Sequence, residues 1–148
     1  MKKRGMGEKG FTLSEMLVVF VIVIIVGALM TPFIRYSSKR TERIVCANNL
    51  QNIGLALYIY AREHNGNFPA SLKKLYDEQY LSDQQLLDCP ASKNIGSPKS
   101  PDYVYTDGLS IKDPSLLPLV RDKAGNHPQG GGNILYVNGA VVWKEEVD

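Results

Sequence analysis

Residues able to do chemistry are few in this chain and lie far apart in its sequence. There are two cysteines, Cys46 and Cys89, and two histidines, of which His127 precedes a run of glycines. Zinc sites usually pair such residues about two to four positions apart, a pattern that this spacing does not match. No spacing of Ser or Asp around His127 supports a catalytic triad, so we expect a histidine in a surface loop. The sequence therefore predicts neither an enzyme nor a zinc site.

Glu15 is unusual because of the residues that follow it. From Met16 to Ile34 the chain runs for 19 residues without a charged side chain. A helix of this length spans about 28 Å, close to the roughly 30 Å of a bilayer's hydrocarbon core, so the stretch predicts one transmembrane helix. A carboxylate at the start of such a helix is costly in lipid and indicates a functional group with a partner. The alternative is a carboxylate that lies at the level of the lipid headgroups.

The charge of the chain is concentrated in its first ten residues. Residues 1–10 hold four basic side chains and one acidic one, which leaves thirteen basic and fourteen acidic side chains in the remainder. Binding to nucleic-acid phosphates needs a basic surface, so we expect no nucleic-acid partner. The apolar stretch exceeds the roughly 7 to 15 residues found in a signal peptide, which favours a retained membrane anchor.

The residues before the apolar stretch form a recognisable motif. Gly10-Phe11-Thr12-Leu13-Ser14-Glu15 closely resembles the processing motif of type IV prepilins and type II secretion pseudopilins. The resemblance implies that a prepilin peptidase cuts after Gly10 on the cytoplasmic side and that the new N-terminal Phe11 is N-methylated. It also implies that Glu15 pairs with the Phe11 amine of a neighbouring subunit during assembly.

Pro32 lies inside the helical pattern, where a proline removes a backbone donor and kinks or loosens the helix. Pilins similar to this chain carry a proline at a similar place, and the resemblance implies that the segment before Pro32 loosens in the filament. The alternative is a kink of the helix where it leaves the membrane.

After Arg35 the pattern becomes that of an amphipathic helix, which ends near Asn65-Gly66. The predicted buried face of this helix comprises Ile44, Ala47, Leu50, Ile53, Leu57 and Tyr60.

The rest of the chain predicts short elements of a head domain. Ser71 and Ser82 are placed to begin short helices. Tyr103 to Tyr105 is typical of a strand. Leu116 to Val120 is a weaker strand candidate because Pro118 interrupts it.

The strongest β signal is a hairpin near the C-terminus. Ile134 to Val137 and Ala140 to Trp143 consist largely of β-forming residues and flank Asn138-Gly139. Asn-Gly between two such runs indicates a type I′ turn, which needs positive φ at both residues. Together these patterns predict an α+β fold in which a long N-terminal helix packs against a small antiparallel sheet of three strands, and the resemblance to prepilins implies that this fold is pilin-like.

A second resemblance covers the C-terminal part. His127, the glycines after it and Asn138-Gly139 look like the signature of prepilin-associated proteins known for a His, nine residues and Asp-Gly; this chain has ten residues and Asn-Gly. The segments around Cys46 and Cys89 look like that group as well.

The resemblance also bears on the cysteines. It implies that the head lies outside the cytoplasm, where disulfides persist. We therefore predict a bond between Cys46 and Cys89, which would stabilise the fold by a few kcal/mol; two free, buried thiols are the alternative.

One cofactor is implied by the resemblance to major pseudopilins, which can hold calcium near a loop like the one that contains Asp102, Asp107 and Asp113. Calcium prefers several oxygen ligands, but the spacing of these aspartates matches no fixed calcium motif. No other cofactor is predicted.

These inferences divide the chain into a cleaved leader peptide (1–10), a transmembrane and assembly helix (11–34), a helical spine (35–65) and a globular head (66–148). The resemblance implies a structural subunit of a type II secretion pseudopilus or type IV pilus, held in the inner membrane by one span, with a periplasmic or extracellular head. Its implied partners are copies of itself, other pilin-like subunits, the prepilin peptidase, an inner-membrane assembly platform and the lipid bilayer. The alternative is a minor pilin, a membrane-tethered module that binds DNA, a surface or a secretion substrate.

Overall fold

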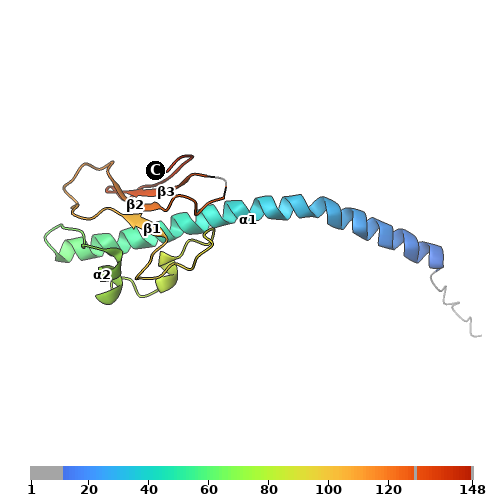
Figure 1. Ribbon diagram of the computed structural model, residues 1–148, viewed down its shortest axis with the longest axis horizontal. Coiled ribbons are helices and arrows are strands. Elements are labelled where there is room, and N and C mark those ends of the chain that lie inside the picture. The colour runs from blue at the N-terminus through green and yellow to red at the C-terminus, as the bar shows by residue number, and fades with distance from the viewer. Residues whose placement is uncertain (1–11, 129, 148) are drawn as a thin grey trace, which may run out of the picture. The chain divides into compact units, whose positions relative to one another are not determined.

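The computed structural model describes residues 12–128 and 130–147, without the side chains of residues 30–38. A long helix is followed by short helices and then by strands, which confirms the predicted α+β fold (Figure 1). The elements are α1 (Leu13–Glu63), α2 (Leu72–Asp77), the 3₁₀ helix η1 (Gln84–Leu87), β1 (Tyr103–Tyr105), β2 (Pro118–Asp122), β3 (Gly132–Tyr136) and β4 (Val141–Lys144).

The chain divides into two compact units, Met1–Ser38 and Lys39–Asp148. The second unit contains the C-terminal half of α1 together with α2, η1 and the four strands. The predicted helical spine and the predicted head therefore fold largely as one body.

The C-terminal half of α1 is amphipathic, as its sequence pattern predicts. Its fully buried side chains include Cys46, Leu50, Ile53 and Leu57. Ile44 was expected on this face but is 53% exposed, because the buried stripe begins at Cys46 instead. The helix ends where Asn65 and Gly66 both adopt positive φ, and the Gly66 N–H donates to the carbonyl of Ala61.

The two short helices begin at side-chain caps. Ser71 precedes α2, and its hydroxyl accepts the backbone N–H of Lys74. Asp83 precedes η1 and accepts the N–H of Gln85. Both caps satisfy backbone donors that have no partner within the helix. The second short helix was expected to start at Ser82, one residue before the observed cap.

The sheet has four antiparallel strands in the order β1-β2-β3-β4, one more than predicted. The weak strand candidate around Pro118 is β2, which pairs on both of its edges. Pro118 is tolerated because it is the first residue of β2 and because the register with β3 shifts between Pro118 and Val120.

β3 and β4 form the predicted hairpin, but the turn between them is not type I′. Among the described residues other than glycine, only Asn65 and Gln79 have positive φ, so Asn138 does not. The Gly139 N–H donates to the carbonyl of Tyr136, and Gly139 has a φ of 83°. This pattern is a type I turn followed by a glycine bulge, the usual three-residue hairpin loop.

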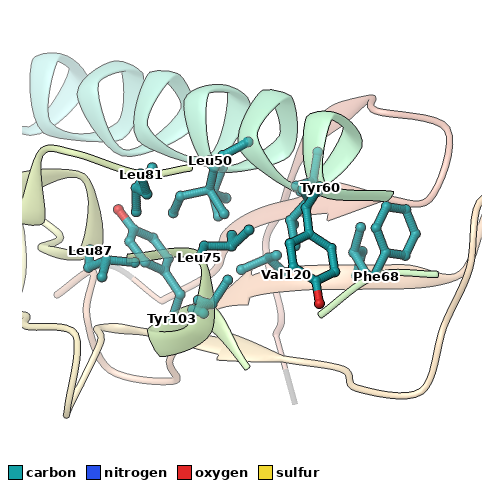
Figure 2. Close-up of a cluster of buried hydrophobic side chains, with 14 of the residues drawn as sticks. Leu50, Tyr60, Phe68, Leu75, Leu81, Leu87, Tyr103 and Val120 are labelled. Atoms are coloured by element: carbon teal, nitrogen blue, oxygen red, sulfur yellow. The ribbon is translucent and has the colours of Figure 1, made fainter. Parts of the chain in front are cut away.

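The core of the second unit lies between α1, the short helices and the sheet (Figure 2). In Figure 2 the side chains of Leu50 and Tyr60 point from α1 toward Tyr103 and Val120 on the strands. Leu75, Leu81 and Leu87, from the segment that holds α2 and η1, close the cluster. The strands and short helices thus depend on the apolar face of α1 for their burial.

Leu57→Ala tests this dependence. Leu57 is fully buried, so its truncation should lower the free energy of unfolding by about 3 kcal/mol. Leu55, two residues away on α1, is 63% exposed, and Leu55→Ala should change the free energy by less than about 0.5 kcal/mol. Urea unfolding of the chain in mild detergent, followed by Trp143 fluorescence, measures both. Equal losses from the two variants would show that the described core is wrong.

Candidate functional site

The predicted assembly carboxylate, Glu15, lies in the first turn of α1. Its Oε2 accepts the backbone N–H of Thr12 at 2.9 Å and the Thr12 hydroxyl at 2.7 Å. The Glu15 N–H in turn faces the Thr12 hydroxyl oxygen at 3.3 Å. This reciprocal arrangement is a capping box, which the Thr-x-x-Glu spacing encodes. Gly10 and Phe11, the predicted cleavage site, lie outside the described residues.

The described apolar side chains from Leu13 to Leu29 are not covered by other described residues. Thirteen large apolar side chains in this stretch are each at least 47% exposed: Leu13, Met16, Leu17, Val18, Val19, Phe20, Val21, Ile22, Val23, Ile24, Ile25, Val26 and Leu29. A helix that is apolar on every side normally lies within lipid or within a larger protein core.

Of the helices formed by the described residues, none combines the length and the apolar character that crossing a membrane requires. The transmembrane helix over residues 11–34 stays a prediction. Pro32 is assigned within α1, but its side chain belongs to the undescribed set, so the predicted kink is untested.

Cys46 and Cys89 meet inside the second unit, together with two residues that the sequence did not connect with them. The four side chains Cys46, Cys89, Asp122 and His127, here called the four-residue cluster, are all buried. The two Sγ atoms lie 3.1 Å apart as free thiols, whereas a disulfide needs about 2.05 Å. The structure thus places the two sulfurs close together without a bond between them, and the predicted disulfide stays a prediction.

His127 is not the surface-loop histidine that the sequence suggested. It is 2% exposed, and its Nε2 lies 3.1 Å from Asp122 Oδ2 and 3.7 Å from Cys89 Sγ. Its ring packs nearly perpendicular to that of Trp143, at a centroid distance of 5.1 Å. The connection between β2 and β3 folds inward here, which local sequence composition does not reveal.

Asp122, at the end of β2, is the residue that joins the cluster together. Its Oδ1 accepts a hydrogen bond from the Cys46 thiol at 2.9 Å. Its Oδ2 faces His127 and also accepts the backbone N–H of Asn133 at 2.6 Å. A buried carboxylate needs such donors, because burial without them costs several kcal/mol.

The cluster perturbs the acidity of its members. A hydrogen bond with Cys89, together with burial, raises the pKa of the Cys46 thiol well above its usual range. The same hydrogen bond, helped by those from His127 and the Ala91 N–H, lowers the pKa of Cys89 to about 6 against the effect of burial. Burial lowers the pKa of His127, but hydrogen bonds with Asp122 and Cys89 outweigh it and raise this pKa to about 9.

The three aspartates of the calcium hypothesis have separate surroundings. Asp102 is buried and accepts the backbone N–H of Cys89 at 3.1 Å. Asp113 accepts the N–H and the hydroxyl of Ser110, and Asp107 is exposed. In the described part of the chain, the four-residue cluster is the one group of three or more such side chains placed to hold a metal. This geometry gives calcium binding no support, and the hypothesis stays untested.

Comparisons with known proteins agree with the N-terminal motif. The family model for the prokaryotic N-terminal methylation motif matches residues 5–31. The ComG operon protein 3 homologue of Bacillus licheniformis is 30% identical over 90 residues, which make up 61% of this chain and 90% of the relative. Competence protein ComGC of Bacillus subtilis is 34% identical over 91 residues, or 61% of this chain and 89% of the relative. No solved structure matches the chain.

These matches confirm the resemblance to type IV prepilins. They combine a processing motif before an uncovered apolar helix with similarity over about nine tenths of each relative's length. The chain belongs to the family of ComGC-like competence pseudopilins, which are type IV pilin-like proteins, and it is a pilin-like structural subunit that assembles with other pilin subunits.

Proposed function

We propose that this chain is a membrane-anchored subunit that forms the shaft of a competence-type pilus. The observation that carries the proposal is the uncovered apolar surface of α1 between Leu13 and Leu29, with one carboxylate, Glu15, at its start. The two relatives are named for the ComG operon and for competence, which favours this machine over a secretion pseudopilus.

The uncovered surface calls for a different partner at each stage. Before assembly, lipid covers the apolar side chains, because contact with water is unfavourable for so large an apolar area. During assembly, the α1 helices of other subunits replace the lipid, and close packing between helices supplies the attraction. The four-stranded head then lies outside the helical core of the filament.

Glu15 has two partners in this scheme. Within one chain, the capping box with Thr12 holds the carboxylate at the helix start. An ionised carboxylate has about four acceptor positions on its two oxygens, so these bonds leave capacity for a further donor. The Phe11 amine of a neighbouring subunit is that donor in the filament, and the pairing sets the axial stagger of subunits.

Processing must come first, because the Phe11 amine exists only after the leader is removed. A prepilin peptidase cuts the Gly10-Phe11 bond at the cytoplasmic face, and an inner-membrane platform then lifts the subunit from the bilayer. The subunit's own role is structural rather than enzymatic. Near-neutral charge after residue 10, with thirteen basic and fourteen acidic side chains, disfavours the alternative of a DNA-binding minor pilin.

Shearing of cells tests the proposal. The native chain should be recovered with sheared surface filaments, in an amount that rises with total filament length, as expected for a shaft subunit. An amount that stays constant per filament would instead indicate a tip or minor subunit. A chain found only in the membrane fraction of cells that make filaments would contradict the proposed function.

A further inference from the structure

The four-residue cluster brings together the side-chain types that bind transition metals. Two sulfurs, one imidazole nitrogen and one carboxylate oxygen all lie within 4.8 Å of one another. Ligands of a tetrahedral zinc ion at about 2.0–2.3 Å lie about 3.3–3.8 Å from each other. The two sulfurs lie 3.1 Å apart and His127 Nε2 lies 3.7 Å from Cys89 Sγ. Asp122 faces Cys46 Sγ with its Oδ1, at 2.9 Å, and His127 Nε2 with its Oδ2, at 3.1 Å. Small side-chain adjustments would therefore be enough for the cluster to surround an ion.

The four side chains come from four different parts of the fold. Cys46 belongs to α1, Cys89 follows η1, Asp122 ends β2, and His127 lies in the connection between β2 and β3. All four belong to the same compact unit, Lys39–Asp148. An ion bound here would tie α1 to the sheet and to the segment after η1, in addition to the apolar core and hydrogen bonds such as those from Asn49 to the Asp88 carbonyl and from Asn133 to the Arg43 carbonyl.

Neighbouring groups hold these side chains in place. The backbone N–H and the side-chain amide of Asn133 both donate to Asp122 Oδ2, at 2.6 and 3.2 Å. The Tyr103 hydroxyl lies 3.3 Å from Cys46 Sγ, and the Trp143 ring packs on His127. Metal sites in proteins have such outer contacts, which orient the ligands.

A disulfide explains only half of the cluster. It would use Cys46 and Cys89 and give no reason for a fully buried carboxylate, Asp122, to face the Cys46 sulfur. A buried anion is costly unless positive charge and hydrogen bonds compensate it. A protonated His127 compensates Asp122 alone, whereas a divalent cation would supply positive charge to Asp122 and to both sulfurs at once.

We propose that Cys46, Cys89, Asp122 and His127 bind one divalent transition metal ion, most simply Zn²⁺, in a four-coordinate structural site. Thiolate and imidazole ligands select zinc over calcium and magnesium, which prefer oxygen. On binding, Cys46 and Cys89 coordinate as thiolates and His127 as a neutral imidazole, and the protons that these three side chains carry beforehand pass to solvent. Because all four ligands are protein side chains and all are buried, no position remains for a substrate, so the ion is structural.

Metal analysis of the full chain tests the proposal. The protein is purified in mild detergent from zinc-supplemented cells without chelator, and its metal content is measured by mass spectrometry. We expect roughly one zinc ion per chain. His127→Gln should lower the zinc content at least about tenfold. The matched control is His64→Gln, because His64 stacks on Tyr60 outside the cluster, and this variant should keep its zinc.

Two measurements on the unaltered chain keep the test decisive if His127→Gln fails to fold. After a chelator removes the metal, added Co²⁺ should produce the strong visible absorption of a tetrahedral site with thiolate ligands. Both thiols should resist alkylation while the metal is bound and react after chelation without any reductant. A chain with less than about a tenth of an equivalent of zinc and no cobalt absorption would overturn the proposal. Thiols that react only after reduction would also overturn it and would establish the disulfide instead.

Discussion

Replacing Glu15 with alanine should reduce the amount of the chain in filaments at least about tenfold, because it removes one partner of the proposed charge pair, which the proposal places out of contact with water in the filament core. Membrane insertion and leader cleavage should remain nearly unchanged, since the helix becomes more apolar and the Gly10 bond is five residues away. The measurement compares processed protein in the membrane with protein in sheared filaments, with the variant as the sole copy.

The capping box makes a sharper design available, because it separates the charge of Glu15 from its hydrogen bonds. Glutamine at this position also completes a capping box, so Glu15→Gln keeps the bonds to Thr12 and loses only the charge. Thr12→Ala keeps the charge of Glu15 and the bond from the backbone N–H of residue 12, and it removes only the bonds made by the Thr12 hydroxyl. We expect Glu15→Gln to fail in assembly as Glu15→Ala does, and Thr12→Ala, once shown to be processed, to assemble. Normal filaments from Glu15→Gln would sink the charge-pair hypothesis and assign Glu15 to helix capping alone.

Replacing Gly10 with leucine should abolish removal of the leader and, with it, assembly. Glycine lets a protease approach the peptide backbone closely, and a branched side chain blocks that approach. Because an unprocessed chain has no free Phe11 amine, its filament yield should fall below detection. The fraction of uncut protein, measured by intact mass, is the readout.

Gly7→Leu is the matched control for this experiment, because Gly7 is a glycine of the same leader three residues before the cut. It should be processed and assembled normally. Efficient cleavage of the Gly10→Leu chain at the same bond, or equal loss in both variants, would contradict the assignment of Gly10.

Local patterns in the sequence predicted the elements of the fold well. The apolar periodicity of residues 50 to 60 determines which face of α1 is buried, and Asn138-Gly139 marks the hairpin between β3 and β4. The type of turn was wrong because Asn-Gly also suits a type I turn with a bulge, in which only the glycine needs positive φ. The sheet was predicted with three strands because Pro118 lies within the candidate strand Leu116 to Val120. A proline interrupts a strand from within but is tolerated as its first residue, which is where Pro118 lies in β2.

The four-residue cluster could not be predicted in the same way. Cys46, Cys89 and Asp122 are separated by more than thirty residues each and meet only through tertiary packing. His127 lies among glycines and polar residues, a composition that is typical of an exposed loop. One feature of the sequence could have pointed to the cluster. Both cysteines and His127 lie in the segments that look like prepilin-associated proteins, which is consistent with a shared role for the three side chains.

The most direct test of the central claim, that the chain is a processed filament subunit, is the mass of its N-terminal peptide in sheared filaments. We predict a peptide that begins at Phe11 and carries one added methyl group on its amine, with no leader-containing form in the same fraction. A filament fraction whose chain still begins at Met1, or begins beyond Ile34, would contradict the claim.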